Sequence, residues 1–277
     1  MSKTPRYTWI VTDQAAGRYT LPGEVTAAWS EWCRLAEHTI PQPAEVDPVS
    51  TAAAELRRAA RGESPLLTRV PGLTMVEAEA HAARAAQRAL DQAQTEARLD
   101  FEAQVIEHLE VIVRDHLAPV HAELVDEARQ LWPKIAHLTT PAEAVRGDEQ
   151  TRTAWLRVEA LAIQFGVILD VASRANQAGE TVVQHPELAK HYSTVRDPAT
   201  AWPDFNRLQH QVRAGASGPW AGTARERLLW LAANQTTATW LPTVAELNAL
   251  VEQQHAEEFA ARERGLVAKQ AVREWSA

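Results

Sequence analysis

The chain has 277 residues, of which 45% are hydrophobic and 23% are charged; this is the composition of a globular protein with one large or two ordinary domains, and it excludes a disordered chain. The net charge of −8 disfavours binding to nucleic acid or to anionic lipid, because both carry negative charge. The single cysteine, Cys33, excludes an intramolecular disulfide and a multi-cysteine zinc site.

The sequence contains no predicted membrane or export segment. The first residues, MSKTPRYTWIVTDQ, lack the apolar core of a signal peptide. No stretch approaches the run of about 18 apolar residues that a membrane-spanning helix needs. We therefore expect no membrane partner, and a protein that is cytoplasmic or part of an assembly built in the cytoplasm.

Residues 1–40 are predicted to form a short β-hairpin followed by a helix. Helix formers dominate the chain and glycines are few, so the fold as a whole is expected to be mainly α. The hairpin is the exception, because YTWIV is β-branched and aromatic and an Ala-Gly break separates it from RYTL. From Glu24 to Glu37 the apolar residues recur at three and four residues, which predicts one face of a helix.

Residues 41–72 are predicted to be a proline-containing linker with one short helix. The helix begins at Asp47-Pro48, is expected to run to Arg61, and has Gly62 just past its end. Further helix starts are predicted at capping boxes, in which a Thr and a Glu side chain satisfy each other's backbone N–H groups. These boxes pair Thr74 with Glu77, Thr140 with Glu143, Thr223 with Glu226, and Thr243 with Glu246.

Residues 73–137 are predicted to form a long acidic helix of coiled-coil character. Nothing breaks the helical pattern between Thr74 and Pro119, and a continuous helix of that length would be a rod of roughly 68 Å. The alternative is a break near Thr95 that folds the segment into an antiparallel pair. Pro119 is expected to kink the helix, or to end it and start another.

Apolar residues step by three and four along this segment, which predicts a seam for a second helix. The second part of the seam follows an eleven-residue period, which favours straight or slightly right-handed packing. Acidic residues carry nearly all of the net charge here, which indicates either a solvated face or a surface for a basic partner. The candidate interaction residues are Ala83, Ala86, Leu90, Ala93, Ala97, Ile106, Leu109, Val113 and Leu117.

Residues 138–277 are predicted to form a C-terminal helical bundle. From Thr151 to Gln177 apolar residues cover well over half of the helix circumference, so this helix is expected at the centre of the bundle. Gln164 and Asp170 on it would then need polar partners. An irregular stretch follows as far as Gly222, and two helices begin at Thr223 and Thr243.

The sequence contains no recognisable catalytic motif. Walker-type loops, G-x-G-x-x-G, G-x-S-x-G and H-E-x-x-H are all missing, which favours a protein that is not an enzyme and has no cofactor. The spacings between His108, His116 and His121 do not match those of metal ligands on one helix, so no metal site is predicted. Cys33 could be a nucleophile with His38 as its base, but it lies on an apolar helix face and is expected to be a buried thiol.

The leading hypothesis is a non-enzymatic helical interaction or structural protein. The long helix would mediate homo-oligomerisation or bind a protein partner. In its acidic, Ala-rich, helical and cysteine-poor composition the chain resembles phage and prophage scaffolding and virion accessory proteins. That resemblance implies a role in virion assembly.

Two alternatives belong to other classes. The first is a helical small-molecule binding protein or enzyme, with a pocket between the helix at 155–172 and the C-terminal helices and with Gln164 and Asp170 as its polar groups. The second is a nucleic-acid-associated protein, which the charge balance disfavours. Its basic patch would be Arg57, Arg58 and Arg61, or else Arg262, Arg264, Lys269 and Arg273.

Overall fold

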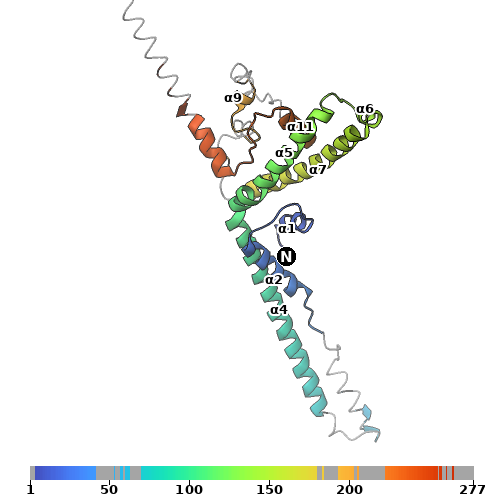
Figure 1. The fold of residues 1–277 in the computed structure, drawn as a ribbon. Coiled ribbons are helices and arrows are strands. Elements are labelled where there is room, and N and C mark those ends of the chain that lie inside the picture. Colours follow the sequence, from blue (N-terminus) through green and yellow to red (C-terminus); the bar gives the residue numbers. More distant parts are fainter. Residues whose placement is uncertain are drawn as a thin grey trace, which may run out of the picture. The chain divides into compact units, whose positions relative to one another are not determined.

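The computed structural model describes residues 4–41, 53, 57–58, 60–62, 70–179, 183, 193–202, 205, 222–254, 256–257, 260 and 264. Helices dominate these residues and none of them lies in a strand, which confirms the mainly α fold class (Figure 1). The chain divides into two compact units. Unit 1 contains Met1–Thr8 and Gly23–Val105, and unit 2 contains Trp9–Pro22 and Ile106–Ala277. The four segments predicted in chain order remain a prediction.

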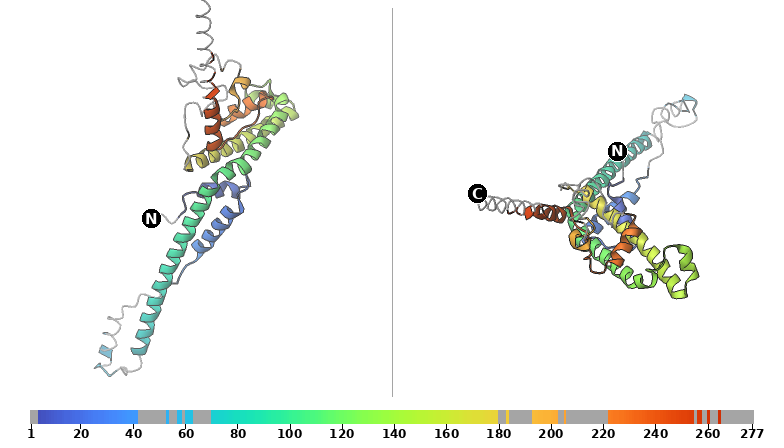
Figure 2. Two further views of the ribbon diagram at one scale, coloured as in Figure 1. Left: turned by 90° about the vertical axis from the view of Figure 1, so that its left-hand side faces the viewer. Right: turned by 90° about the horizontal axis from the view of Figure 1, so that it is seen from above.

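Unit 1 is built from helix α2 (Gly23–Glu37) and most of helix α4 (Val70–Val111), which lie side by side (Figure 1, Figure 2). The predicted apolar face of α2 points toward α4. The ring of Trp29 stacks on Trp32, with centroids 5.0 Å apart, and lies 5.2 Å from the ring of Phe101 on α4. The side-chain amide of Gln94 on α4 donates a hydrogen bond of 2.8 Å to the carbonyl of Leu35. Aromatic contacts and one half-buried amide therefore hold the two helices together.

Helix α4 is continuous through Thr95, so the antiparallel pair considered as an alternative is not formed. The helix begins at Val70, before the capping box predicted at Thr74. Pro71 stands in its first turn, where a missing backbone N–H costs nothing. A coiled-coil pairing of α4 with a helix of another chain remains a prediction.

The effect expected of Pro119 takes the form of a π-helical segment. Helix α4 continues into η2 (Ile112–Leu117), a π-helix, and then into α5 (Ala118–Ile135), with Pro119 in the first turn of α5. The backbone N–H of Ala118 donates to the carbonyl of Val113, five residues earlier. Because proline has no N–H and its ring crowds the carbonyl four residues before it, a wider turn ahead of Pro119 accommodates it.

Unit 2 is a helical bundle formed chiefly by α5, α7 (Glu149–Ala178) and α11 (Ala224–Ala233), which contact one another (Figure 2). Helix α6 (Pro141–Arg146) connects α5 to α7, and α9 (Pro198–Ala201) is a single short turn. The capping boxes predicted at Thr140, Thr223 and Thr243 are all present. Large side chains fill the bundle core, among them Phe165, Leu161, Ile168, Leu228 and Leu231.

The predicted N-terminal β-hairpin is wrong, because its first strand is helix α1 (Thr8–Ala15). The Ala-Gly break is the end of this helix. Gly17 adopts a φ of 71°, its N–H donates to the carbonyl of Gln14, and the N–H of Arg18 donates to the carbonyl of Asp13. The hydroxyl of Tyr19 then donates to the carbonyl of Ile10 at 2.6 Å. Burial of Ile10 and Val11 in unit 2 outweighs the β propensity of the segment.

Two sequence predictions fall mainly outside the described residues. Of the helix predicted from Asp47 to Arg61, residues 53, 57–58 and 60 are helical. Most of the irregular stretch before Gly222 also lies outside the described part of the chain. The last predicted helix begins as expected, with residues 244–254 helical after the cap at Thr243.

Candidate functional site

The first part of the predicted seam lies on α4 in unit 1. Ala86 is exposed and Ala97 is buried. The other three seam residues in this part of α4 are half-buried: Ala83, Leu90 and Ala93. The hydrogen bond from Gln94 to Leu35 places α2 beside the end of this part of the seam. Its N-terminal part therefore keeps an accessible small residue at Ala86.

The second part of the predicted seam belongs to unit 2 and is mostly buried inside the chain. Leu109, Val113 and Leu117 are all at most 5% exposed, and they contribute to the core of unit 2. Ile106, in contrast, is 40% exposed. Leu109, Val113 and Leu117 are therefore already covered within one chain.

Two buried residues of α4 were missed by the sequence analysis. Phe101 and Val105 are 0% exposed. Together with the buried seam residues they form a row in which every step is four residues, from Ala97 to Leu117. Since each helical residue turns by about 100°, a constant step of four drifts around the helix by about 40° per step. The predicted seam mixes steps of three and four, which keep closer to one side of the helix, and it therefore selected Ile106 in place of Val105.

Helix α7 buries the predicted apolar face, but it is not buried all round. Leu156 is 64% exposed and Ile163 is 69% exposed, Ala160 is exposed and Val167 is half-buried. These four residues step by 4, 3 and 4, and we call them the α7 outer face. The sequence signal for it was the apolar cover of more than half of the circumference, which also fits a fully buried helix.

A cavity of about 630 Å³ lies in unit 2 next to Gln164, one of the two polar residues singled out on this helix. It opens between α7, α5 and the turn after α1, and not toward the C-terminal helices. Its charged and amide side chains are Gln14, Arg18, Glu123, Glu127, Arg157 and Gln164, and Tyr19 and Thr20 also line it. The second polar residue, Asp170, is elsewhere: its carboxylate pairs with Arg174 at 2.6 Å on the surface.

The arginines that line this cavity are already paired with carboxylates. Arg157 on α7 makes a two-pronged ion pair with Glu127 on α5, with Nε to Oε1 at 2.6 Å and Nη2 to Oε2 at 2.8 Å. These hydrogen bonds lower the pKa of Glu127. Arg18 pairs with Asp13. Both guanidinium groups are neutralised, and Glu123 adds a carboxylate to the lining. The cavity therefore disfavours anions and suits a polar ligand that is neutral, zwitterionic or cationic, which the amides of Gln14 and Gln164 could bind by hydrogen bonds.

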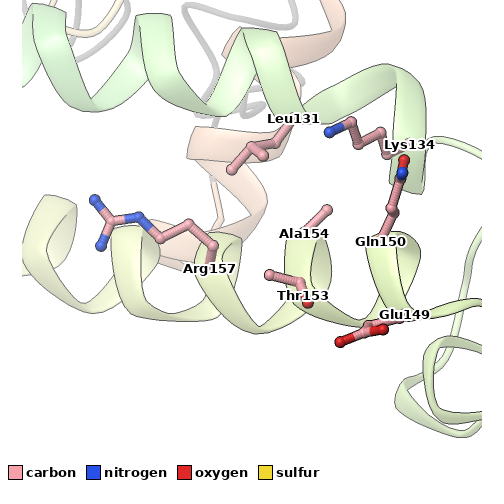
Figure 3. A pocket seen from close by; sticks show the side chains of 7 residues that line it. All are labelled: Leu131, Lys134, Glu149, Gln150, Thr153, Ala154 and Arg157. Atoms are coloured by element: carbon pink, nitrogen blue, oxygen red, sulfur yellow. The ribbon is translucent and has the colours of Figure 1, made fainter.

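A smaller cavity of about 400 Å³ lies on the other side of Arg157 (Figure 3). Leu131 and Lys134 reach it from α5, whereas the other lining residues come from α7. The apolar side chains of Leu131 and Ala154 form its middle, and Figure 3 shows Lys134 and Gln150 close together at one end. This site is an open groove between two helices with no clustered charge of one sign.

Among the described histidines, His121 on α5 has the most perturbed pKa, and it is part of the core of unit 2. It is 1% exposed, and its ring lies 5.0 Å from the ring of Phe165 on α7. Burial, together with the positive charge of Arg227, lowers the pKa of His121 from 6.5 to about 4. The imidazole is therefore neutral at physiological pH and acts as an aromatic core side chain.

The other candidates for chemistry are also tied into the fold. His116 shares a hydrogen bond of 2.8 Å with the hydroxyl of Thr20. Cys33 is half-buried, and burial together with the charge of Glu37 raises the pKa of its thiol, which disfavours the thiolate that a nucleophile needs. Within the described residues, no three His, Cys, Asp or Glu side chains are grouped closely enough to hold a metal ion.

Comparison with protein-family models, with curated proteins and with solved structures finds no match to this chain. Among the described helices, none is long and apolar enough to cross a membrane. The fold and surfaces define an all-α protein with accessible apolar residues on two of its helices and a polar cavity between α5 and α7.

Proposed function

We propose that this chain is a non-enzymatic helical interaction protein that self-associates or packs into a larger assembly. A scaffolding or accessory role in virion assembly is the candidate process, suggested by composition. The observation that carries the proposal is the exposure of apolar side chains on two helices, one of which carries the predicted seam. These side chains are Ala86 on α4, and Leu156 and Ile163 on α7.

An amphipathic helix is stabilised when its apolar side is removed from water, by about 25 cal/mol per Å² of apolar surface. Small residues at a seam allow two helix backbones to approach closely, as at Ala86. Exposed apolar residues arranged in a row therefore favour association with another helix over a solvated surface.

The first test is a matched pair of substitutions on α4. Ala86 and Ala85 are both exposed, but only Ala86 belongs to the seam. We expect Ala86→Glu to weaken self-association by about tenfold or more, because a carboxylate at the seam must be dehydrated or hold the helices apart. Sedimentation equilibrium of the full chain measures the association constant.

Ala85→Glu is the control, since it adds the same charge and the same side chain to the same turn of the helix. It should leave the association constant nearly unchanged. Equal effects of the two substitutions would show that the seam of α4 is not an association surface.

The second candidate function is binding of a small polar molecule in the cavity beside Gln164. The observation that favours it is the size of this cavity, about 630 Å³, which is in the range of ligand sites. The pairing of Arg157 with Glu127 and of Arg18 with Asp13, together with the carboxylate of Glu123, selects against anionic ligands.

We expect a neutral sugar or a zwitterionic amino acid to shift the side-chain amide resonances of Gln164 in a saturable way. Gln164→Leu should abolish binding, whereas Asp170→Asn, a change on the same helix away from the cavity, should not. Titration by NMR with a panel of these two classes checks the prediction. A panel that leaves the Gln164 amide unperturbed, or binding that survives Gln164→Leu, would contradict it.

A further inference from the structure

We propose that the α7 outer face binds the same face of a second copy of this chain, with the two α7 helices antiparallel. This inference rests on the self-association in the proposed function, but it uses a different helix and specifies the partner and the geometry. The side chains of Leu156 and Ile163 are 64% and 69% exposed to solvent, although the other sides of α7 pack against α5 and α11.

The outer face has the spacing of a helix–helix seam. Leu156, Ala160, Ile163 and Val167 alternate steps of four and three, as the a and d positions of a heptad do. Continuing the same steps in both directions reaches polar residues at the ends. These are Thr153 and Glu149 toward the N-terminus, and Asp170 and Arg174 toward the C-terminus.

The polar ends are complementary to each other, which determines the direction of pairing. In an antiparallel pair with its twofold axis between positions 161 and 162, Ala160 faces the partner's Ile163 and Leu156 faces the partner's Val167. The same register places Glu149 opposite the partner's Arg174, and Thr153 opposite the partner's Asp170. Each contact occurs twice, as in any isologous interface.

A parallel pair in register would have the opposite charge pattern. Each residue would face its own copy, so that Glu149, Asp170 and Arg174 would all meet like charges. Like charges in facing positions repel, and charged flanks are a common device by which helices select orientation. The sequence of the outer face therefore fits one arrangement of two copies and opposes the other.

The charged side chains are accessible in the single chain. Asp170 and Arg174 form an ion pair with each other at 2.6 Å, and both side chains are about half exposed. The guanidinium of Arg174 lies 5.9 Å from the centroid of the Trp9 ring, which holds it beside the end of the outer face. Glu149 is exposed in the first turn of α7, where the helix dipole favours a carboxylate.

The size of the surface indicates a dimer of moderate strength. The outer face and its polar ends, from Glu149 to Arg174, extend over roughly 38 Å of helix. A single pair of helices of this length lies at the lower end of stable interface sizes, and we expect a dissociation constant in about the micromolar range. The dimer is therefore expected to form and dissociate with concentration.

Charge reversal tests the proposal on the full chain. Arg174→Glu places a carboxylate opposite the partner's Glu149 at both ends, and we expect the dimer to weaken by about tenfold or more at low salt. The double variant Glu149→Arg with Arg174→Glu restores opposite charges and should return the dissociation constant to within about threefold of the original. Arg146→Glu on α6 is the matched control, because it makes the same charge change away from the outer face.

A cross-linking experiment tests the orientation. In a Cys33→Ser background, one chain carries Glu149→Cys and another carries Arg174→Cys. The mixture should form a disulfide-linked dimer under mild oxidation, whereas neither chain alone should. Efficient cross-linking of either chain by itself would indicate parallel helices and overturn the proposal.

The outcomes separate this inference from the proposed function. If Arg174→Glu and Ile163→Ser both leave the dissociation constant unchanged while Ala86→Glu dissociates the oligomer, the α7 pairing is wrong and self-association through α4 stands. If the α7 variants dissociate the dimer and the double reversal restores it, the pairing is supported. A chain that stays monomeric at every concentration contradicts both.

Discussion

Replacing Phe101 by alanine is expected to destabilise unit 1 by about 3–5 kcal/mol, the cost of truncating a fully buried aromatic side chain. Phe101 is 0% exposed, and the ring of Trp29 on α2 lies 5.2 Å from it. Loss of this contact removes the main aromatic attachment of α2 to α4. Hydrogen exchange measured by mass spectrometry should therefore become faster across Gly23–Glu37, and urea denaturation should show the lower free energy of unfolding.

Leu99→Ala is the control for this experiment. Leu99 is on the same helix two residues away, but it is 52% exposed. Its truncation should cost less than about 1 kcal/mol and leave exchange in α2 unchanged. If Leu99→Ala were as costly as Phe101→Ala, the assignment of the buried side of α4 would be wrong.

His121 is expected to make unit 2 sensitive to mild acid. Its pKa is about 4 in the folded protein and 6.5 without burial, so the unfolded chain takes up the proton first as the pH falls. Stability should therefore decrease below about pH 6.5. The loss attributable to this residue reaches about 2 kcal/mol at pH 5 and levels off at about 3 kcal/mol below pH 4.

Substitution by a residue that does not titrate should remove this contribution. Urea denaturation between pH 7.5 and pH 4.5 measures the free energy of unfolding. As the pH falls, this free energy should decrease less steeply for His121→Leu than for the original protein, whatever its value at pH 7.5. Leu161→Ala is the control, because it truncates a fully buried side chain of the same core without removing a titratable group; its curve should lie lower but keep the original steepness. Parallel curves for His121→Leu and the original protein would contradict the assignment of His121 as a buried neutral base.

The sequence predicted best what local chemistry determines. The caps at Thr140, Thr223 and Thr243 form within a few residues, and the structure contains them. The effect of Pro119 likewise follows from its missing N–H, although the π-helical form it takes depends on the surrounding helix.

The predictions that failed depend on tertiary packing. The segment at Thr8–Ala15 has β propensity, but its helix is fixed by burial of Ile10 and Val11 and ended by Gly17. Which of Val105 and Ile106 is buried depends on where the neighbouring elements lie around α4, and a repeat of three and four cannot supply that information.

The candidate surfaces show the same limit. Apolar residues cover most of the α7 circumference, which fits two cases: a helix buried on all sides, and a helix that keeps a second apolar face exposed. Only the exposed fractions of Leu156 and Ile163 separate these cases. The cavity beside Gln164 is lined by residues from the end of α1 and the turn after it, from α5 and from α7, which are far apart in sequence. Gln164 was identified as a polar residue in an apolar helix, but the elements that face it were not.

The measurement that tests the central claim most directly is size-exclusion chromatography with multi-angle light scattering on the full chain over a wide range of concentrations. Self-association predicts a mass that rises with concentration to that of a dimer or a larger oligomer. A mass that stays at the 30.6 kDa of one chain at every concentration would contradict it.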